Sequence, residues 1–257
     1  MEWKKAKWLI IAVLLAVNVF LAFNIIVKYS QAQKASRGEL LDALSLTREL
    51  PGFSEETFSS LPVYIYSFTS RRSVSTEQAL AQSLLSSPVT PSEAGGGVTI
   101  YQSGEYRVTF RRGGYTEGFI AAKGGDLKNL SSVLKRAGIK NTVTDDGVAF
   151  SYKGKEILNA SLTAKSDGAV FSFSGTVPMS DGWTRSVRSL SRGELILALA
   201  RHVKENGLGK LLSVTVSYRV TPTGVQDISL IPIMTVECEN GGLIMSMTDK
   251  TLIYSGN

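Results

Sequence analysis

The chain has 257 residues, of which 43% are hydrophobic, and its formal net charge is +6 at pH 7. This length suits one large domain or two small ones with a packed hydrophobic core. Half of the net charge lies in residues 1–30, where four lysines face one glutamate, so the rest of the chain is nearly neutral. Basic residues stand at most in pairs such as Arg71-Arg72, so we expect no nucleic-acid partner.

The first predicted element is a membrane-spanning helix over residues 8–27. This segment carries no charged residue, and only Asn18 and Asn24 interrupt its apolar sequence. As a helix it would extend about 30 Å, which is the thickness of the hydrocarbon core of a bilayer. No later segment is as long and apolar, so the sequence predicts a single-pass membrane protein and excludes a multipass one.

A cleavable secretory signal is the alternative to a retained membrane anchor. Ser30 and Ala32 place small residues at the positions that a signal peptidase requires. The apolar segment is longer than a usual signal core, however, and Trp3 and Trp8 stand where interfacial anchors are found. We therefore expect a retained anchor in the cell membrane, with residues 1–7 as a short cytoplasmic tail and the C-terminal domain outside the cell.

Two kinds of side chain in the span predict contacts with partner helices. The carboxamides of Asn18 and Asn24 have donors and acceptors that lipid cannot satisfy. Ala12 and Ala16 form a patch of small residues that would let another helix approach closely. These four residues are the candidate partner-binding site. The alternative is that the helix tolerates both asparagines without a partner, since Asn24 lies near the outer interface.

A stalk helix and linker, residues 28–60, and a first α+β subdomain, residues 61–140, are expected after the span. Ser36 and Glu39 have the spacing of a capping box, which predicts that a new helix begins there and ends at Pro51. The expected elements of the first subdomain are a strand over 61–68, a helix capped by Ser75, a loop over 86–97, an antiparallel meander over 98–102, 106–111 and 115–121, and a helix over 126–137 closed by Gly138.

The second α+β subdomain is predicted over residues 141–257, with a similar order of elements. Ser191 and Glu194 form the clearer capping box, and they begin a helix that ends at Gly207. Strands are expected over 148–153, 157–164, 169–177, 211–220, 225–236 and 243–254. The predicted fold class is therefore α+β, with one transmembrane helix followed by antiparallel sheets that carry packed helices in two similar subdomains.

No residue pattern predicts a catalytic, metal-binding or cofactor-binding site. The chain has one histidine, His202, and one cysteine, Cys238, so neither a metal-binding pair nor an internal disulfide can form from them. Neither a nucleophile elbow nor a phosphate-binding loop is present. The sequence does leave open a catalytic dyad of one serine and one lysine. We expect a protein without enzymatic activity and without cofactors, in which His202 and Cys238 have structural roles.

The N-terminal sequence resembles a known family. Residues 1–7, MEWKKAK, are followed by Leu14-Leu15 and by the segment NVFL from Asn18 onwards. This pattern resembles the start of the YycI-type two-component-system regulatory proteins of Gram-positive bacteria. The resemblance implies an extracytoplasmic α+β domain on a single-pass anchor, which works with a sister protein, YycH, to restrain the WalK sensor histidine kinase through membrane helices. It implies no catalytic residues, and it favours Asn18 as the residue that faces a partner.

The function predicted from the sequence is regulation of a two-component sensor histidine kinase. The protein would contact a WalK-like kinase and a YycH-like sister protein through transmembrane helices, as part of a hetero-oligomer that serves cell wall homeostasis. Two alternatives stay open. One is a module for cell-envelope assembly or ligand binding, and the other is an anchored enzyme that acts on the cell wall.

Overall fold

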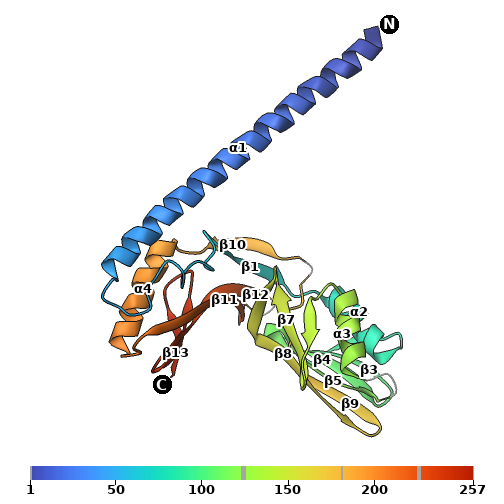
Figure 1. The fold of residues 1–257 in the computed structure, drawn as a ribbon. Helices are drawn as coiled ribbons and strands as arrows, with labels where there is room; N and C mark the ends of the chain where they lie inside the picture. The colour runs from blue at the N-terminus through green and yellow to red at the C-terminus, as the bar shows by residue number, and fades with distance from the viewer. Residues whose placement is uncertain (1, 123–125, 181, 225–226, 257) are drawn as a thin grey trace.

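The computed structural model of the chain describes residues 2–122, 126–180, 182–224 and 227–256. A long N-terminal helix, α1 (Glu2–Leu46), projects from a domain in which a large mixed sheet is covered by shorter helices (Figure 1). This arrangement confirms the predicted α+β fold class. The helix is long and apolar enough to cross a membrane, and none of its apolar window is buried inside the protein.

The helix α1 is unbroken for 45 residues, so the expected second helix start at Ser36 is wrong. Ser36 lies inside α1 with a buried side chain, and its hydroxyl has no hydrogen-bond partner among the described residues. The spacing of a capping box marks a helix start only where the preceding backbone is not already helical. Here the helix of the span already exists when the chain reaches Ser36. Adding further residues to an existing helix costs little free energy, because only the first turn is costly to form.

The remaining elements fall into two groups along the chain. The first group contains β1 (Tyr66–Arg71), α2 (Val74–Leu85), β2 (Pro91–Glu93), β3 (Thr99–Ser103), β4 (Tyr106–Phe110), the 3-10 turn η1 (Arg112–Gly114), β5 (Tyr115–Ala121) and α3 (Leu127–Arg136). The second group contains β6 (Asn141–Val143), β7 (Gly147–Tyr152), β8 (Lys155–Asp167), β9 (Val170–Thr176), β10 (Thr184–Arg188), α4 (Arg192–Glu205), β11 (Leu211–Pro222), β12 (Asp227–Cys238), β13 (Gly241–Ser246) and β14 (Leu252–Gly256).

Several predicted boundaries need correction. The strand expected over 61–68 begins only at Tyr66, and α2 is capped by Ser73, whose hydroxyl accepts a hydrogen bond from the backbone of Thr76, rather than by Ser75. The single strand expected over 243–254 is two strands, β13 and β14, because Lys250 takes a left-handed conformation in a turn between them. The short strands β2, β6 and β10 were not expected, since their polar sequences carry no apolar alternation.

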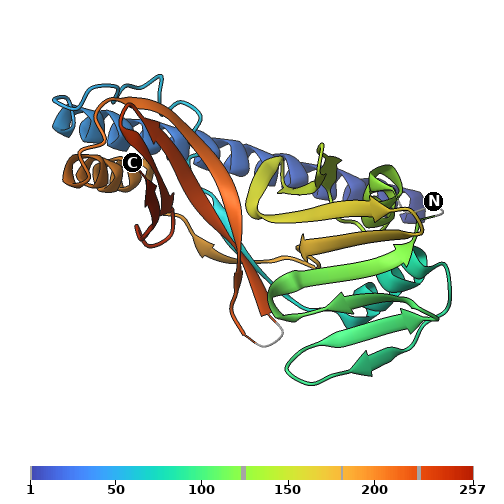
Figure 2. The same ribbon diagram turned by 90° about the horizontal axis from the view of Figure 1, so that it is seen from below.

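The sheet consists of two antiparallel parts that meet at one parallel pairing. The strands run in the order β10-β1-β12-β11-β8-β9-β5-β4-β3-β2, and the junction is the pairing of Tyr218 in β11 with Ile157 in β8. Figure 2 shows how far the two parts extend to either side of this junction. The division into subdomains at residues 61–140 and 141–257 stays a prediction, and the pairing of β5 with β9 crosses its boundary.

Each part of the sheet has its own hydrophobic core. The distal core packs α2 and α3 on the strands β3 to β9, and its largest side chains include Tyr101, Phe110 and Phe150. The α1-proximal core packs α4 on β11, β12 and β13 and includes Leu40 and Ala43 from the last turns of α1. The α+β domain thus holds the end of the long helix as part of its own interior.

Candidate functional site

The helix geometry places the four predicted contact residues of the span on different faces. Each helical residue is rotated by about 100° from the one before it. Ala12 and Ala16 therefore lie one turn apart on one face, whereas Asn18 lies on roughly the opposite side, about 160° from Ala16. Asn24 lies between these two faces, about 80° from Ala16. The structure thus brings Ala12 and Ala16 together but neither asparagine beside them.

Each asparagine side chain donates one amide N–H to the backbone of α1. The side-chain nitrogen of Asn18 donates to the carbonyl oxygen of Leu14 at 2.9 Å, and that of Asn24 donates to the carbonyl oxygen of Phe20 at the same distance. These bonds lower the free energy of placing a carboxamide in lipid. Each carboxamide oxygen still projects from the helix, where a donor on another helix can reach it.

The face that carries Asn18 is also the face that docks on the α+β domain. Eighteen residues separate Asn18 from Ser36, which is five full turns at about 3.6 residues per turn, so the two side chains point the same way. Ser36, Leu40 and Ala43 are buried against the domain. In Figure 1 the helix continues straight from this docked end into the span. The Ala12 and Ala16 face consequently points away from the domain.

The joint between α1 and the domain is closely packed. Leu40 and Ala43 are each 2% exposed, and they share the α1-proximal core with Leu195 of α4. A Cβ at Gly193 would come within 3.0 Å of the carbonyl oxygen of Glu39, so glycine permits close approach of α4 and α1.

The start of α4 is itself fixed by local interactions. Ser191 and Glu194 form the predicted capping box, and Lys250 lies 3.6 Å from the Glu194 carboxylate. A hydrogen bond from the backbone of Ser191 and the charge of Lys250 hold the pKa of Glu194 below its ordinary value. Arg192 donates to the carbonyl oxygen of Leu61, which attaches the linker after α1 to the same helix.

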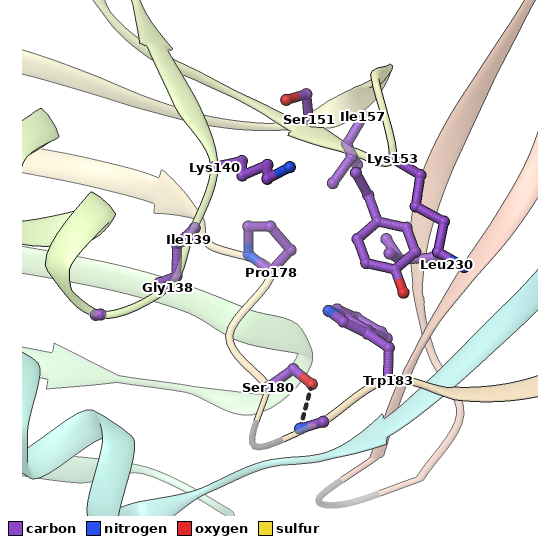
Figure 3. Close-up of a pocket in the computed structure, with 13 residues that line it drawn as sticks. Gly138, Ile139, Lys140, Ser151, Lys153, Ile157, Pro178, Ser180, Trp183 and Leu230 are labelled. Carbon is purple, nitrogen blue, oxygen red and sulfur yellow. Dashed lines mark hydrogen bonds between the residues drawn. The ribbon is translucent and has the colours of Figure 1, made fainter. Parts of the chain in front are cut away.

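A pocket of about 240 Å³ lies between the two parts of the sheet, as Figure 3 shows. Tyr152 and Trp183 form its aromatic wall, with their ring centroids 5.7 Å apart. Lys140 points into it, and Ser151 of β7 lines it as well. The wall is backed by an aromatic cluster, in which Tyr152 contacts Phe68 at 4.9 Å and Tyr218 at 5.8 Å.

The lining of this junction pocket combines lysine cations with aromatic rings. Its charged lining residues are Lys140 and Lys153, and the Lys153 amine lies 4.3 Å from the centre of the Phe68 ring. Burial raises the pKa of Tyr152 and raises that of Tyr218 to about 12, so both phenols stay protonated at neutral pH. The volume is below the range of about 300 to 1,000 Å³ that is usual for ligand pockets, which limits any ligand to a small one.

Sequence reasoning missed the junction pocket and one buried ion pair. Arg72 forms a bidentate pair with Glu77, which is 1% exposed, and also donates to Thr99 at 3.0 Å. Burial raises the pKa of Glu77, although the hydrogen bond and charge of Arg72 act in the opposite direction. The pair ties the end of β1 to α2 and β3, which is a structural role. Only spatial neighbours distinguish Arg72 from the exposed Arg71 before it.

His202 and Cys238 lie far from any reactive arrangement. A ring nitrogen of His202 lies 3.3 Å from the carbonyl oxygen of Lys250. Cys238 is buried at the end of β12, and burial raises the pKa of its thiol, so the reactive thiolate is disfavoured. Among the residues that the structure describes, no group of three His, Cys, Asp or Glu side chains could hold a metal ion.

Comparisons with known proteins give little further information. No protein-family model matches the chain, and no curated protein matches it. Among solved structures, it is similar to the Bacillus megaterium YpeB C-terminal domain, with 12% identity and a TM-score of 0.32, over 73% of this chain and 98% of that one. At this identity and TM-score the similarity supports no inference about function.

Proposed function

We propose that the protein is a single-pass membrane regulator that acts on a sensor histidine kinase through contacts between transmembrane helices. Residues 1–7 would lie in the cytoplasm and the α+β domain outside the cell. The observation that carries this proposal is the continuity of α1, which is one helix from the span to the core of the outer domain. No enzymatic activity forms part of the proposal.

A continuous helix can transmit motion between the domain and the span. The last turns of α1 are buried in the α1-proximal core, so a shift or rotation of the domain must move the helix with it. Packed helices switch between discrete arrangements through translations and rotations of this kind. A span joined by a flexible linker would lose such coupling, since a linker absorbs rotation.

The two faces of the span fit two partners. The small residues Ala12 and Ala16 suit the close approach of one helix, and the carboxamide of Asn18 suits a polar contact with a second helix on the other side. The two partners would be the kinase and a YycH-like sister protein, in a hetero-oligomer. Asn24, on an intermediate face, would lie at the edge of the second contact.

The experiment that tests this function compares three span variants at equal protein level. A polar helix contact contributes about 0.6 to 2 kcal/mol, so Asn18→Leu should weaken partner association roughly 3- to 30-fold. Ala16→Leu should weaken the contact on the opposite face. Leu15→Ile is the control, because Leu15 is 67% exposed and lies on the side of α1 opposite Asn24, about 100° from Ala16 and about 60° from Asn18. In-membrane crosslinking and a kinase-dependent reporter give the two measurements.

Different outcomes for the two faces would identify which partner each one contacts. Loss of crosslinking to the kinase in one variant and to the sister protein in the other would support the arrangement. Wild-type association and reporter output in both Asn18→Leu and Ala16→Leu would contradict the helix-contact mechanism. Crosslinking mainly to a peptidoglycan synthase would favour a role in cell-envelope assembly instead.

Ligand binding in the junction pocket is a second candidate function. It is favoured by the wall of Tyr152 and Trp183 opposite the amine of Lys140, which suits a small sugar with an acidic group. N-acetylmuramic acid is a suitable probe, and quenching of Trp183 fluorescence would report its binding. Trp183→Phe removes the signal, and Lys140→Gln should weaken binding without removing it. Unchanged fluorescence at saturating probe would contradict this second function.

A further inference from the structure

A groove of about 540 Å³ separates α1 from the domain at the point where the helix leaves the predicted span. Its helix side is formed by one face of α1, and its domain side by the segment before β1, by β1 and by the end of β10. Figure 1 shows β10 and β1 as the strands on the side of the domain that faces α1. The lining of the groove includes Ile25, Lys28 and Tyr29 on the helix and Tyr64, Tyr66 and Arg188 on the domain.

The depth of the span fixes where this groove lies relative to a membrane. Ile25 belongs to the last turn of the span, and Lys28 and Tyr29 follow directly after it. With residues 8–27 in a bilayer, the end of the groove beside Ile25 and Lys28 lies at the level of the lipid headgroups, and Tyr64, Tyr66 and Arg188 line the domain side of the same groove. Tyrosine and basic side chains are the residues that favour this interface.

The groove presents cations that no carboxylate neutralises. Lys28 and Arg188 line the groove, and the Arg188 guanidinium lies 4.9 Å from the centre of the Tyr64 ring. Arg185 is outside the groove lining but adjoins it, since its guanidinium lies 4.3 Å from the centre of the Tyr66 ring. Within the described ranges, neither arginine nor Lys28 forms an ion pair.

Glu39 is the acidic residue that lines the groove, and it lies at the end away from the span. It is eleven residues beyond Lys28 along α1, which is about 16 Å. The end of the groove at the membrane is therefore positively charged.

We propose, on the basis of the proposed membrane anchor, that this groove binds the headgroup of an anionic phospholipid in the leaflet on the domain side. The phosphate would lie between Lys28 and Arg188, with Arg185 beside them on the Tyr66 ring, and the tyrosine rings would contact the glycerol and the upper acyl chain. The occupant is a lipid rather than a helix of a partner protein, because the groove opens beside the span and carries the unpaired cations Lys28 and Arg188. The bound lipid would hold the domain close to the membrane and limit the tilt of α1.

The test uses the full-length protein in nanodiscs of phosphatidylcholine alone or in an equimolar mixture with phosphatidylglycerol. Hydrogen–deuterium exchange of the peptides that contain Tyr66 and residues 184–188 is measured in both. Exchange should be slower with phosphatidylglycerol, and high salt should remove the difference. The double variant Arg185→Gln/Arg188→Gln should weaken the apparent lipid affinity by roughly 5-fold for each arginine removed.

The matched control is Arg107→Gln. Arg107 is an exposed arginine that stacks on Phe119 at 5.3 Å in the distal part of the sheet, so it has the same local geometry away from the span. It should retain the full lipid effect. Equal exchange in both lipid mixtures, or an equal loss of protection in Arg107→Gln and in the double variant, would overturn the proposal. Protection that appears in native membranes but not in phosphatidylglycerol nanodiscs would assign the groove to a partner protein and would overturn it as well.

Discussion

The two ends of α1 both carry apolar side chains but lie in different surroundings. Leu15 and Phe20 in the span are 67% and 65% exposed, whereas Leu40 near the other end is 2% exposed. The exposed end has no protein neighbour among the described residues, whereas the buried end has its partner in the α+β domain. One helix therefore has an exposed apolar end that is long enough to cross a membrane and another end that belongs to a protein core.

Truncation of the buried end should give the largest effect. Leu40→Ala is expected to lower the free energy of unfolding of the outer domain by about 2 to 5 kcal/mol, since it leaves a cavity in the α1-proximal core. Leu41→Ala is the matched control, because Leu41 is the next residue and is 47% exposed. Urea denaturation of the full chain in detergent, followed by circular dichroism, measures both. Equal losses in the two variants would show that the end of α1 is not docked.

Overpacking the same joint should give the next largest effect. Ala43→Leu inserts a larger side chain into a closed core and should lower the free energy of unfolding by about 1 to 3 kcal/mol. Ala22→Leu, an identical substitution at an exposed position of α1, should leave the domain unchanged. The urea concentration at the midpoint of unfolding is measured for both variants. A domain that tolerates leucine at position 43 would argue for a loose joint between α1 and α4.

A smaller effect is expected from the pH dependence of the joint. The pKa of Glu194 is lowered from 4.5 in the folded protein, so the folded state binds fewer protons than the unfolded state between the two pKa values. The stability that the ionised Glu194 contributes is therefore present above pH 4.5, and it is lost as the pH falls through the pKa of Glu194 in the folded protein. The difference in melting temperature between the wild type and Glu194→Gln should shrink over this range. A difference that stays constant with pH would rule out the ionised carboxylate as its cause.

The smallest effect on the domain is expected from the span. Asn18→Leu should change the free energy of unfolding of the outer domain by less than about 0.5 kcal/mol, because Asn18 contacts only its own helix. The same urea titration checks this value. Together with weakened partner association, it would separate recognition at the exposed end from stability at the buried end. A large loss of domain stability would show that the two ends are not independent.

Parts of the fold that depend on neighbours in sequence were predictable. The cap of α4 at Ser191 and Glu194 was predicted, and α3 begins one residue after the expected start at Asp126, which caps it. The strands β3, β4 and β5 are separated by the glycine turns that were expected. In each case a side chain bonds to backbone within a few residues, or glycine takes a positive φ, so the local sequence is sufficient.

Other elements exist only because distant segments meet. Every residue of β10 is exposed, and its sequence has no apolar alternation. It is a strand because its backbone pairs with the edge of β1, more than 100 residues earlier in the chain, where Thr69 lies opposite Thr184. The junction pocket could not be predicted for the same reason, since Tyr152 and Trp183 come from separate segments that pack on each other.

The sequence by itself determined that residues 8–27 form an apolar helix long enough to cross a membrane, because twenty uncharged residues reach the thickness of a bilayer without help from the rest of the chain. It also determined the fold class, through periodicity and caps that act over a few residues. Only the tertiary structure decided that α1 continues past Ser36 into the α1-proximal core, and that Asn18 points to the domain side while Ala12 and Ala16 point away. The reason is that a helix face acquires a direction only when one end of the helix is docked, and docking depends on side chains from α4 and β11 to β13 that are far away in the sequence.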